Sequence, residues 1–217
     1  MDQISFYNFM ASGQQYWPIS GTKAPTLGAG GAASYPPTGW TGLQNASVDD
    51  NFVAVTIPSF FLNNTAWTTA YIGSNTYITF SSGSGNWSGL SSSNPNLNKL
   101  MLGAADNSYQ RVSTISSGTD YTRIRYEGNG STSGTVGSPG IVYEATFFNI
   151  SKTAGNPTVE VLFGNHNRTT GQAGIADPNT YYATYSQSAN QSYVFVGNAN
   201  GTSWTIYTGY YMVGTGY

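Results

Sequence analysis

Residues 140–165, "GIVYEATFFNISKTAGNPTVEVLFGN", hold two runs rich in β-branched and aromatic side chains on either side of a short polar segment. Such runs are typical of β-strands, and each has about the length of one strand. The polar segment, residues 151–156, contains the Gly and Asn that tight turns favour. The stretch therefore predicts an antiparallel β-hairpin.

Strand-and-turn units of this kind continue from residue 50 to the end of the chain, with turn residues every eight to twelve positions. The octet "YTRIRYEG", residues 121–128, alternates, with its three charged residues on one face and Ile124 and Tyr126 on the other. No segment shows the period of an amphipathic helix, and no internal repeat is visible. About ten short strands predict an all-β protein built as an antiparallel β-sandwich.

The other expected strands follow the same pattern of short apolar or alternating runs between turn residues. They cover residues 51–62, which Pro58 breaks or confines to a sheet edge, residues 67–73 and 76–80 around a Gly-Ser-Asn turn, and residues 98–106, 179–186, 192–198 and 202–213.

The N-terminal region has a different composition. A passage rich in Gly, Ala and Pro, residues 21–39, predicts an irregular, extended segment. We therefore divide the chain into an N-terminal arm, residues 1–46, and a β-sandwich domain, residues 47–217. The arm is either a frayed tail or an attachment segment that docks on a neighbouring subunit. The candidate attachment residues form one short apolar cluster: Ile4, Phe6, Tyr7, Phe9 and Met10.

The charge content excludes several partners. Lys and Arg total seven and Asp and Glu nine among 217 residues. The chain therefore has too few basic residues for a surface patch that binds a phosphate backbone. This argues against nucleic acid and anionic membranes as partners. The absence of cysteine excludes disulfides and thiolate metal sites. The sequence shows neither a signal peptide nor a membrane span, which predicts synthesis in the cytoplasm without export.

Few residues are suited to catalysis. His166 is the only histidine, and a loop histidine bonded to the backbone is the simpler interpretation. Glycoside hydrolysis needs a pair of acids, and the only plausible pair comes from three glutamates in strands that could pair: Glu127, Glu144 and Glu160. Because Arg123 and Arg125 are close in sequence, we expect cross-strand ion pairs rather than a catalytic acid. We therefore predict no catalytic residues, no enzyme activity and no cofactor.

Carboxylates near two predicted turns are weak calcium candidates. Asp49 and Asp50 are adjacent, and Asp106 begins the segment "DNSYQ". Calcium prefers several carboxylate oxygens in one place. Asp and Asn also favour turns through their own side chains, and this is the interpretation we adopt. No bound metal is predicted.

Aromatic side chains are the strongest binding signal. Tyr-rich strands and a Trp in a Gly/Ser loop can stack on sugars or contact a protein partner. In the alternative interpretation, many of these rings fill the core of a chain that is poor in Leu and Ile. The candidate contacts for a glycan or a partner are Trp87, Tyr181, Tyr182, Tyr210 and Tyr211.

Three motifs carry a family resemblance. Residues 71–80, "YIGSNTYITF", 106–112, "DNSYQRV", and 123–128, "RIRYEG", lie in a region, residues 49–168, that resembles a nidogen-like module. This module is common in structural proteins of marine and cyanobacterial tailed phages. Separately, "ISFYNFMA", residues 4–11, is similar to the "ISFSDFYG" segment frequent in phage tail and fibre proteins, although Tyr-Asn replaces Ser-Asp and the final glycine is absent.

The resemblance implies a virion protein made in the host cytoplasm. It implies a non-enzymatic tail or neck fibre, an appendage or a capsid decoration, present as a homo-oligomer among other virion proteins. The expected fold is a jelly-roll or nidogen-like sandwich. In its "DNSYQRV" motif, Asp106, Asn107, Gln110 and Arg111 are expected to form a structural loop in which Arg111 pairs with Asp106. A carbohydrate-recognition module that contacts host surface glycans is the alternative function.

Overall fold

The computed structural model describes residues 15–20, 27, 32, 34–86, 97–129, 139–167 and 172–215. The predicted attachment cluster in residues 4–10 and the candidate Trp87 lie outside the described residues.

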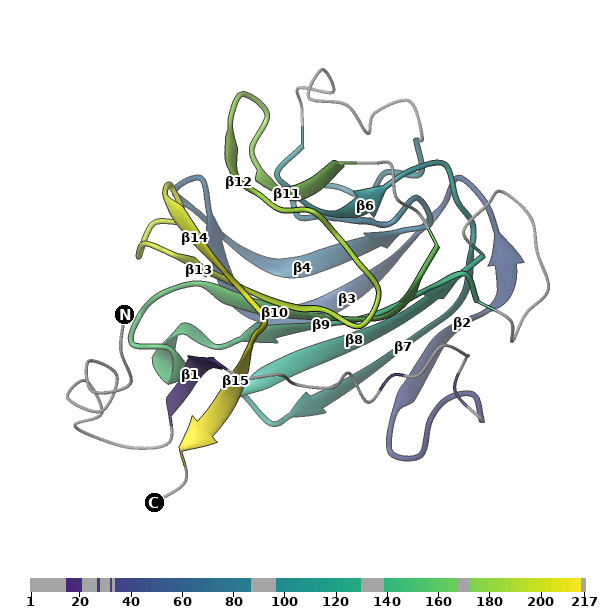
Figure 1. Cartoon of the computed structure of the whole chain (residues 1–217), viewed down its shortest axis with the longest axis horizontal. Coiled ribbons are helices and arrows are strands. Elements are labelled where there is room, and N and C mark those ends of the chain that lie inside the picture. The colour runs from purple at the N-terminus through teal and green to yellow at the C-terminus, as the bar shows by residue number, and fades with distance from the viewer. Residues whose placement is uncertain are drawn as a thin grey trace.

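Two antiparallel sheets pack face to face (Figure 1). The seven-stranded sheet has the order β14 (Trp204–Thr208), β13 (Ser192–Gly197), β10 (Thr158–His166), β9 (Ile141–Phe148), β8 (Tyr121–Gly128), β7 (Tyr109–Ser117) and β2 (Thr41–Val48). The six-stranded sheet has the order β12 (Tyr181–Thr184), β11 (Gln172–Ala176), β6 (Lys99–Ala104), β5 (Tyr77–Thr79), β4 (Thr65–Gly73) and β3 (Phe52–Leu62). The predicted all-β antiparallel sandwich is confirmed.

The hairpin predicted at residues 140–165 is also confirmed. β9 and β10 pair in antiparallel register, with Val159 opposite Phe147 and Leu162 opposite Glu144. The connection contains a short 3-10 helix, Ile150–Lys152, whose N-terminus is capped by the Asn149 side chain. A side-chain cap satisfies a main-chain N–H that the helix itself leaves unpaired, so it stabilises the turn.

Several strands were not expected from the sequence. β1 (Gln15–Ser20), β2, β7 and β11 are additional strands, and the run 202–213 forms two strands, β14 and β15 (Tyr210–Thr215). The break falls at Gly209, whose φ of +76° lies in the left-handed region that glycine adopts without steric cost. Gln110 and Arg111, expected in a loop, belong to β7.

Aromatic rings fill much of the core between the two large sheets. Five adjacent strands, β7, β8, β9, β10 and β13, each contribute one ring to a continuous series. Consecutive ring centroids are 6.5, 4.7, 6.2 and 5.9 Å apart along Tyr109, Tyr126, Tyr143, Phe163 and Tyr193. Cross-strand aromatic pairs of this kind add stability beyond simple burial.

Terminal segments cover the outer face of the seven-stranded sheet. β1 and β15 pair as a small third sheet (Figure 1), with Gln15 opposite Thr215. The Tyr16 ring packs 5.0 Å from the Phe148 ring, and Leu27 is buried in a cluster with Val142 and Leu162. All eight residues of β9 are therefore buried, and both of its faces have to be compatible with burial.

The predicted boundary at residue 46 falls inside a strand, because β2 spans Thr41–Val48. The division into arm and sandwich stays a prediction, but the described part of residues 15–40 lies against the sandwich. Within the described ranges, no helix is long and apolar enough to cross a membrane.

Candidate functional site

The three motif segments meet at one buried polar cluster, which we call the motif node: Ser74, Asn75, Asn107 and Tyr126. The Tyr126 hydroxyl donates to the Ser74 carbonyl at 2.5 Å and accepts from Asn107 Nδ2 at 2.8 Å. The Asn107 main-chain N–H donates to Asn75 Oδ1 at 2.7 Å. All four residues are fully buried. Each of the three motifs contributes at least one member, so the segments form a single structural unit.

The glycine that ends the "RIRYEG" motif has a steric role in the node. A Cβ at Gly128 would lie 2.5 Å from the Tyr126 ring and 2.8 Å from Asn107 Nδ2. Contacts this short do not occur between real side chains, so any larger residue would push the tyrosine or the asparagine out of place. Gly128 therefore permits the hydrogen bonds that join the motifs.

The node also lies beside the weak calcium candidates and contacts one of them, Asp50, directly. Asn75 Nδ2 donates to Asp50 Oδ1 at 3.1 Å, and the Asn107 main chain holds the loop that carries Asp106. One carboxylate oxygen from each of Asp49, Asp50 and Asp106 lies within 4.8 Å of the others. The structure thus brings together residues that are more than fifty positions apart in sequence.

The pKa of Asp49 is raised in this aspartate cluster, and burial is the largest cause. Burial raises the pKa of Asp49, the Asp50 main-chain N–H lowers it, and the charges of Asp50 and Asp106 raise it further. A calcium ion takes about six to eight oxygen ligands, and three carboxylates supply part of such a set. Exposed acidic groups with this spacing are also common without an ion, so the cluster alone assigns no metal.

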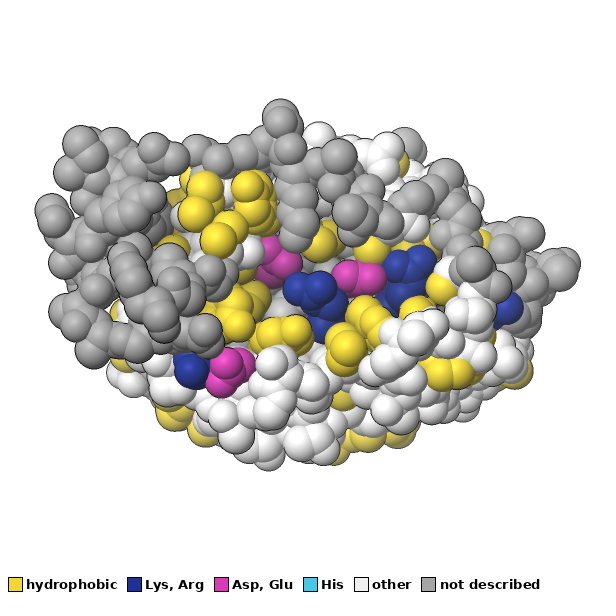
Figure 2. All heavy atoms as spheres, turned by 90° about the horizontal axis from the view of Figure 1, so that it is seen from below, with side chains coloured by type: hydrophobic (Ala, Val, Ile, Leu, Met, Phe, Trp, Pro, Cys, Tyr) yellow, Lys and Arg dark blue, Asp and Glu magenta, His cyan; other side chains and the backbone are white. Residues whose placement is uncertain are grey.

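A row of charged residues crosses the outer face of the seven-stranded sheet. Arg125 Nε lies 3.0 Å from Glu127 Oε1, and Arg125 Nη1 lies 3.1 Å from Glu144 Oε1. Arg111 Nη1 lies 3.8 Å from Glu127 Oε2. Figure 2 shows basic and acidic side chains alternating along the middle of this face, between apolar side chains. This charge row is defined by Arg111, Glu127, Arg125 and Glu144.

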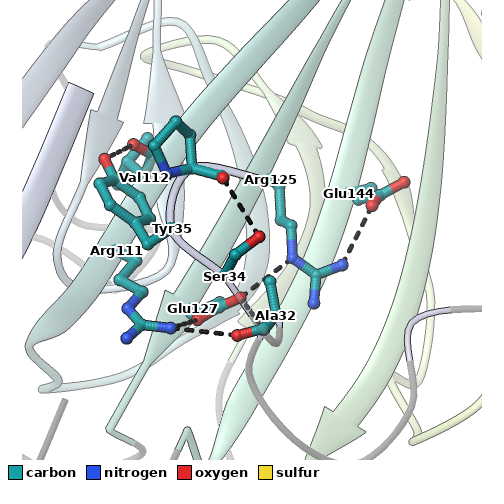
Figure 3. Close-up of polar contacts among 9 residues, drawn as sticks. Ala32, Ser34, Tyr35, Arg111, Val112, Arg125, Glu127 and Glu144 are labelled. Atoms are coloured by element: carbon teal, nitrogen blue, oxygen red, sulfur yellow. Dashed lines mark hydrogen bonds and ion pairs between the residues drawn. The ribbon is translucent and has the colours of Figure 1, made fainter. Parts of the chain in front are cut away.

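The charge row binds the main chain of the N-terminal region (Figure 3). The Ala32 N–H donates to Glu127 Oε1 at 2.8 Å, and Arg111 Nη1 donates to the Ala32 carbonyl at 3.2 Å. The main-chain N–H and carbonyl of Ala32 are therefore both hydrogen-bonded, to Glu127 on β8 and to Arg111 on β7. Arg111 contacts Glu127 and Ala32, and its expected pair with Asp106 stays a prediction.

Tyr35 fixes the same region to the sheet edge. Its hydroxyl donates to the Val112 carbonyl at 2.7 Å and accepts from the Gln44 N–H at 2.9 Å. Gln44 and Val112 are register partners beside a shift in the β2–β7 pairing, so the hydroxyl bridges two main-chain groups of neighbouring strands. A Cβ at Gly42 would lie 2.9 Å from the Tyr35 ring, so the glycine makes room for the ring.

The candidate catalytic residues have structural partners. Glu144 and Glu127 share Arg125, which confirms the expected cross-strand ion pair, and Glu160 Oε2 accepts the Met212 N–H at 2.5 Å. His166 ends β10, where it is buried beside the Phe163 ring. No arrangement of nucleophile, base and orienting acid is apparent among the described residues.

The four described tyrosine candidates lie in two places. Tyr181 and Tyr182 belong to β12, and the Tyr182 hydroxyl donates to Asp177. Tyr210 and Tyr211 belong to β15, on the other side of the molecule in Figure 1. All four are half-buried, so they form two separate pairs and no single aromatic platform.

Phe52 is an exposed ring that the sequence did not single out. It is the only large hydrophobic residue of the described chain that is exposed, at 41%. It begins β3 and makes an edge-to-face contact with the Tyr71 ring at 5.7 Å. The residues before it, "VDDN", do not indicate whether Phe52 faces the core or the solvent. Only the pairing of β3 with its neighbour decides which face of the sheet each residue occupies.

Comparisons with family models, with curated proteins and with solved structures find no match to this chain.

Proposed function

We propose that this protein is a non-enzymatic structural protein of a tailed bacteriophage particle, present in several copies. It serves as a tail or neck fibre, an appendage or a capsid decoration, attached through its N-terminal segment. The observation that carries the proposal is the motif node. The three segments that resemble the phage module come together at Tyr126, which supports reading them as one module and not as three unrelated short matches.

The pairing of the first and last described strands, β1 and β15, supports attachment at one end of the sandwich. Gln15 and Thr215 are paired, and Tyr16 packs on Tyr121 at the start of β8. The aspartate cluster lies near the other end of β8, where Gly128 pairs with Tyr109. An eight-residue strand is about 24 Å long. Anchoring at the terminal end would therefore leave the opposite end exposed to the surroundings.

The experiment is labelling of intact particles with an antibody against the sandwich, combined with deletion of residues 1–14. The deletion leaves β1 in place, so we expect a folded, soluble protein that no longer joins particles. Full incorporation of the truncated chain would show that the N-terminal segment is not the anchor. Absence of the label from particles would overturn the virion assignment itself.

Carbohydrate recognition is the second candidate function. The half-exposed tyrosines on β12 and β15 favour it, because a ring with one open face can stack on a sugar. Under this proposal, Trp87→Ala or Tyr181→Ala abolishes binding to host polysaccharide or to a glycan array. Unchanged glycan binding in both variants would exclude these rings as the contact.

A further inference from the structure

The edge strands of the two large sheets differ in how they are protected. β12 has four residues and a register shift, β14 has five residues, and β2 has two register shifts against β7. β3 has eleven residues and pairs regularly with β4 from Phe52 to Thr56. Short length and bulges are two of the ways in which proteins prevent edge strands from pairing with other chains. The first half of β3 has neither.

Charge does not protect this edge either. No Asp, Glu, Lys or Arg occurs between Asp50 and Lys99, so both β3 and its neighbour β4 are uncharged. The one protective residue is Pro58, which lies within the register shift between Thr56 and Phe60. Among the described strands, β4 is the only neighbour of β3. Residues 52–56 therefore form an unprotected edge, which we call the β3 edge.

The exposed side chains of the β3 edge are small or apolar. Phe52 is 41% exposed, and Ala54 and Thr56 are exposed on the same face of the strand. Val55 between them is buried in the core. A partner on this edge would meet an uncharged surface whose largest exposed feature is the Phe52 ring, and burying the open part of that ring would be favourable.

We infer that a second copy of this chain pairs with the β3 edge, joining two six-stranded sheets into one continuous antiparallel sheet. An antiparallel pair of identical strands is self-complementary, so a twofold axis near Ala54 produces a closed dimer. The inference rests on the proposed function, since a multicopy contact protein is the setting that uses such an edge.

The charges near the edge are compatible with this arrangement. With the axis at Ala54, Phe52 of one copy lies opposite Thr56 of the other, and Asp50 lies opposite Pro58. The two Asp50 residues are then about 27 Å apart, far enough for salt to screen their repulsion. Pro58 and the register shift end the pairing on one side, and the turn at Asp50 ends it on the other, which limits it to about five residues per copy.

Cysteine cross-linking tests the pairing directly. The chain has no cysteine, so single-cysteine variants are unambiguous. Opposed Cα atoms in an antiparallel pair are about 4.5–5.5 Å apart, within the range of about 4.4–6.8 Å that a disulfide spans. We expect the purified full chain carrying Ala54→Cys to form a covalent dimer of twice 23.1 kDa under mild oxidation. The matched control is Thr205→Cys, which lies at an exposed position on the β14 edge and is expected to stay monomeric.

A charge-swap pair separates loss of the interface from misfolding. Ala54→Lys and Ala54→Glu each place like charges opposite one another, so we expect the dimer fraction measured by native mass spectrometry to fall about tenfold or more. An equimolar mixture of the two variants regains the dimer, which a misfolded chain would not do.

The inference fails if the wild-type chain is monomeric at the highest soluble concentration and Ala54→Cys does not cross-link. It also fails if Thr205→Cys cross-links as readily as Ala54→Cys. Failure of the virion proposal looks different, because then the antibody label is absent from particles while the β3 dimer is still observed in solution.

Discussion

Tyr126 and Tyr143 are stacked in the core with ring centroids 4.7 Å apart, yet their hydroxyl groups have opposite roles. The Tyr126 hydroxyl makes the two hydrogen bonds that join the motif segments. Within the described part of the chain, the Tyr143 hydroxyl has no hydrogen-bond partner. Two similar rings in nearly the same environment therefore allow the polar contribution to be separated from ring packing.

We predict that Tyr126→Phe lowers the free energy of unfolding by about 2 kcal/mol, because it leaves a buried amide and a buried carbonyl unpaired. Tyr143→Phe removes an unpaired hydroxyl and is expected to be neutral or slightly stabilising. Denaturant unfolding of both variants measures the difference. An equal change in the free energy of unfolding in both variants would mean that the hydrogen bonds of the motif node contribute nothing beyond ring packing.

The aspartate cluster supports a second prediction at the scale of residues. Burial and the neighbouring charges raise the pKa of Asp49, so the folded state holds its proton more tightly than the unfolded state. Stability from this group is therefore present at low pH and is lost as the pH rises past its ordinary value near 3.8. We expect Asp49→Asn to raise the melting temperature slightly at pH 7 and to leave it unchanged at pH 3.

Calcium provides the control for that prediction. If the cluster binds no calcium, as we expect, then adding calcium leaves the melting temperature of the wild-type chain unchanged. A calcium-dependent rise in the wild type that Asp49→Asn abolishes would instead establish a cation site at Asp49, Asp50 and Asp106.

At the scale of elements, the terminal segments cover a sheet face that would otherwise expose apolar and charged side chains. Leu27 covers Val142 and Leu162, and the β1–β15 pair covers Phe148. The Ala32 N–H donates to Glu127 Oε1, and the Met212 N–H donates to Glu160 Oε2. The described part of the predicted arm is thus part of the folded unit.

We predict that deleting residues 1–14 leaves the free energy of unfolding unchanged, whereas deleting residues 1–31 lowers it by more than about 3 kcal/mol. The longer deletion removes β1 and Leu27, and loss of one buried leucine alone costs about 2–5 kcal/mol. Thermal unfolding followed by circular dichroism compares the two chains. A longer deletion as stable as the full chain would show that the terminal segments do not stabilise the sheet.

At the scale of the whole molecule, a core built from tyrosine makes stability sensitive to alkali. Burial raises the pKa of Tyr126 and Tyr143 above the ordinary value of 10. Above pH 10 these groups ionise in the unfolded chain but stay protonated in the folded chain, so their contribution to stability is present below pH 10 and is lost above it. In that range each of the two tyrosines lowers the free energy of unfolding by about 1.4 kcal/mol for every pH unit.

We therefore predict a cooperative alkaline unfolding transition whose midpoint moves to higher pH in Tyr143→Phe. Tyrosinate absorbance and circular dichroism, followed together, report ionisation and unfolding. A midpoint unaffected by Tyr143→Phe would show that this buried tyrosine does not control the transition.

The local pattern of the sequence determined most of the strands from residue 52 onward, the antiparallel hairpin at residues 140–165 and the faces of β8. Alternation decides which side chains share a face, so it also predicted cross-strand ion pairs, of which Arg125–Glu144 is one. The same local information marked Asp49, Asp50 and Asp106 as weak calcium candidates in two turns, and only the structure brought the three together.

Only the tertiary structure decided what lies on the outer side of each sheet. Alternation in one strand says which face a residue occupies but not what covers that face, because the cover comes from residues distant in sequence. The burial of Leu27, the meeting of three motifs at Tyr126, the exposure of Phe52 and the open edge of β3 all depend on how whole strands are paired and layered. Strand register and layer order are collective properties of the packed chain, so no single segment encodes them.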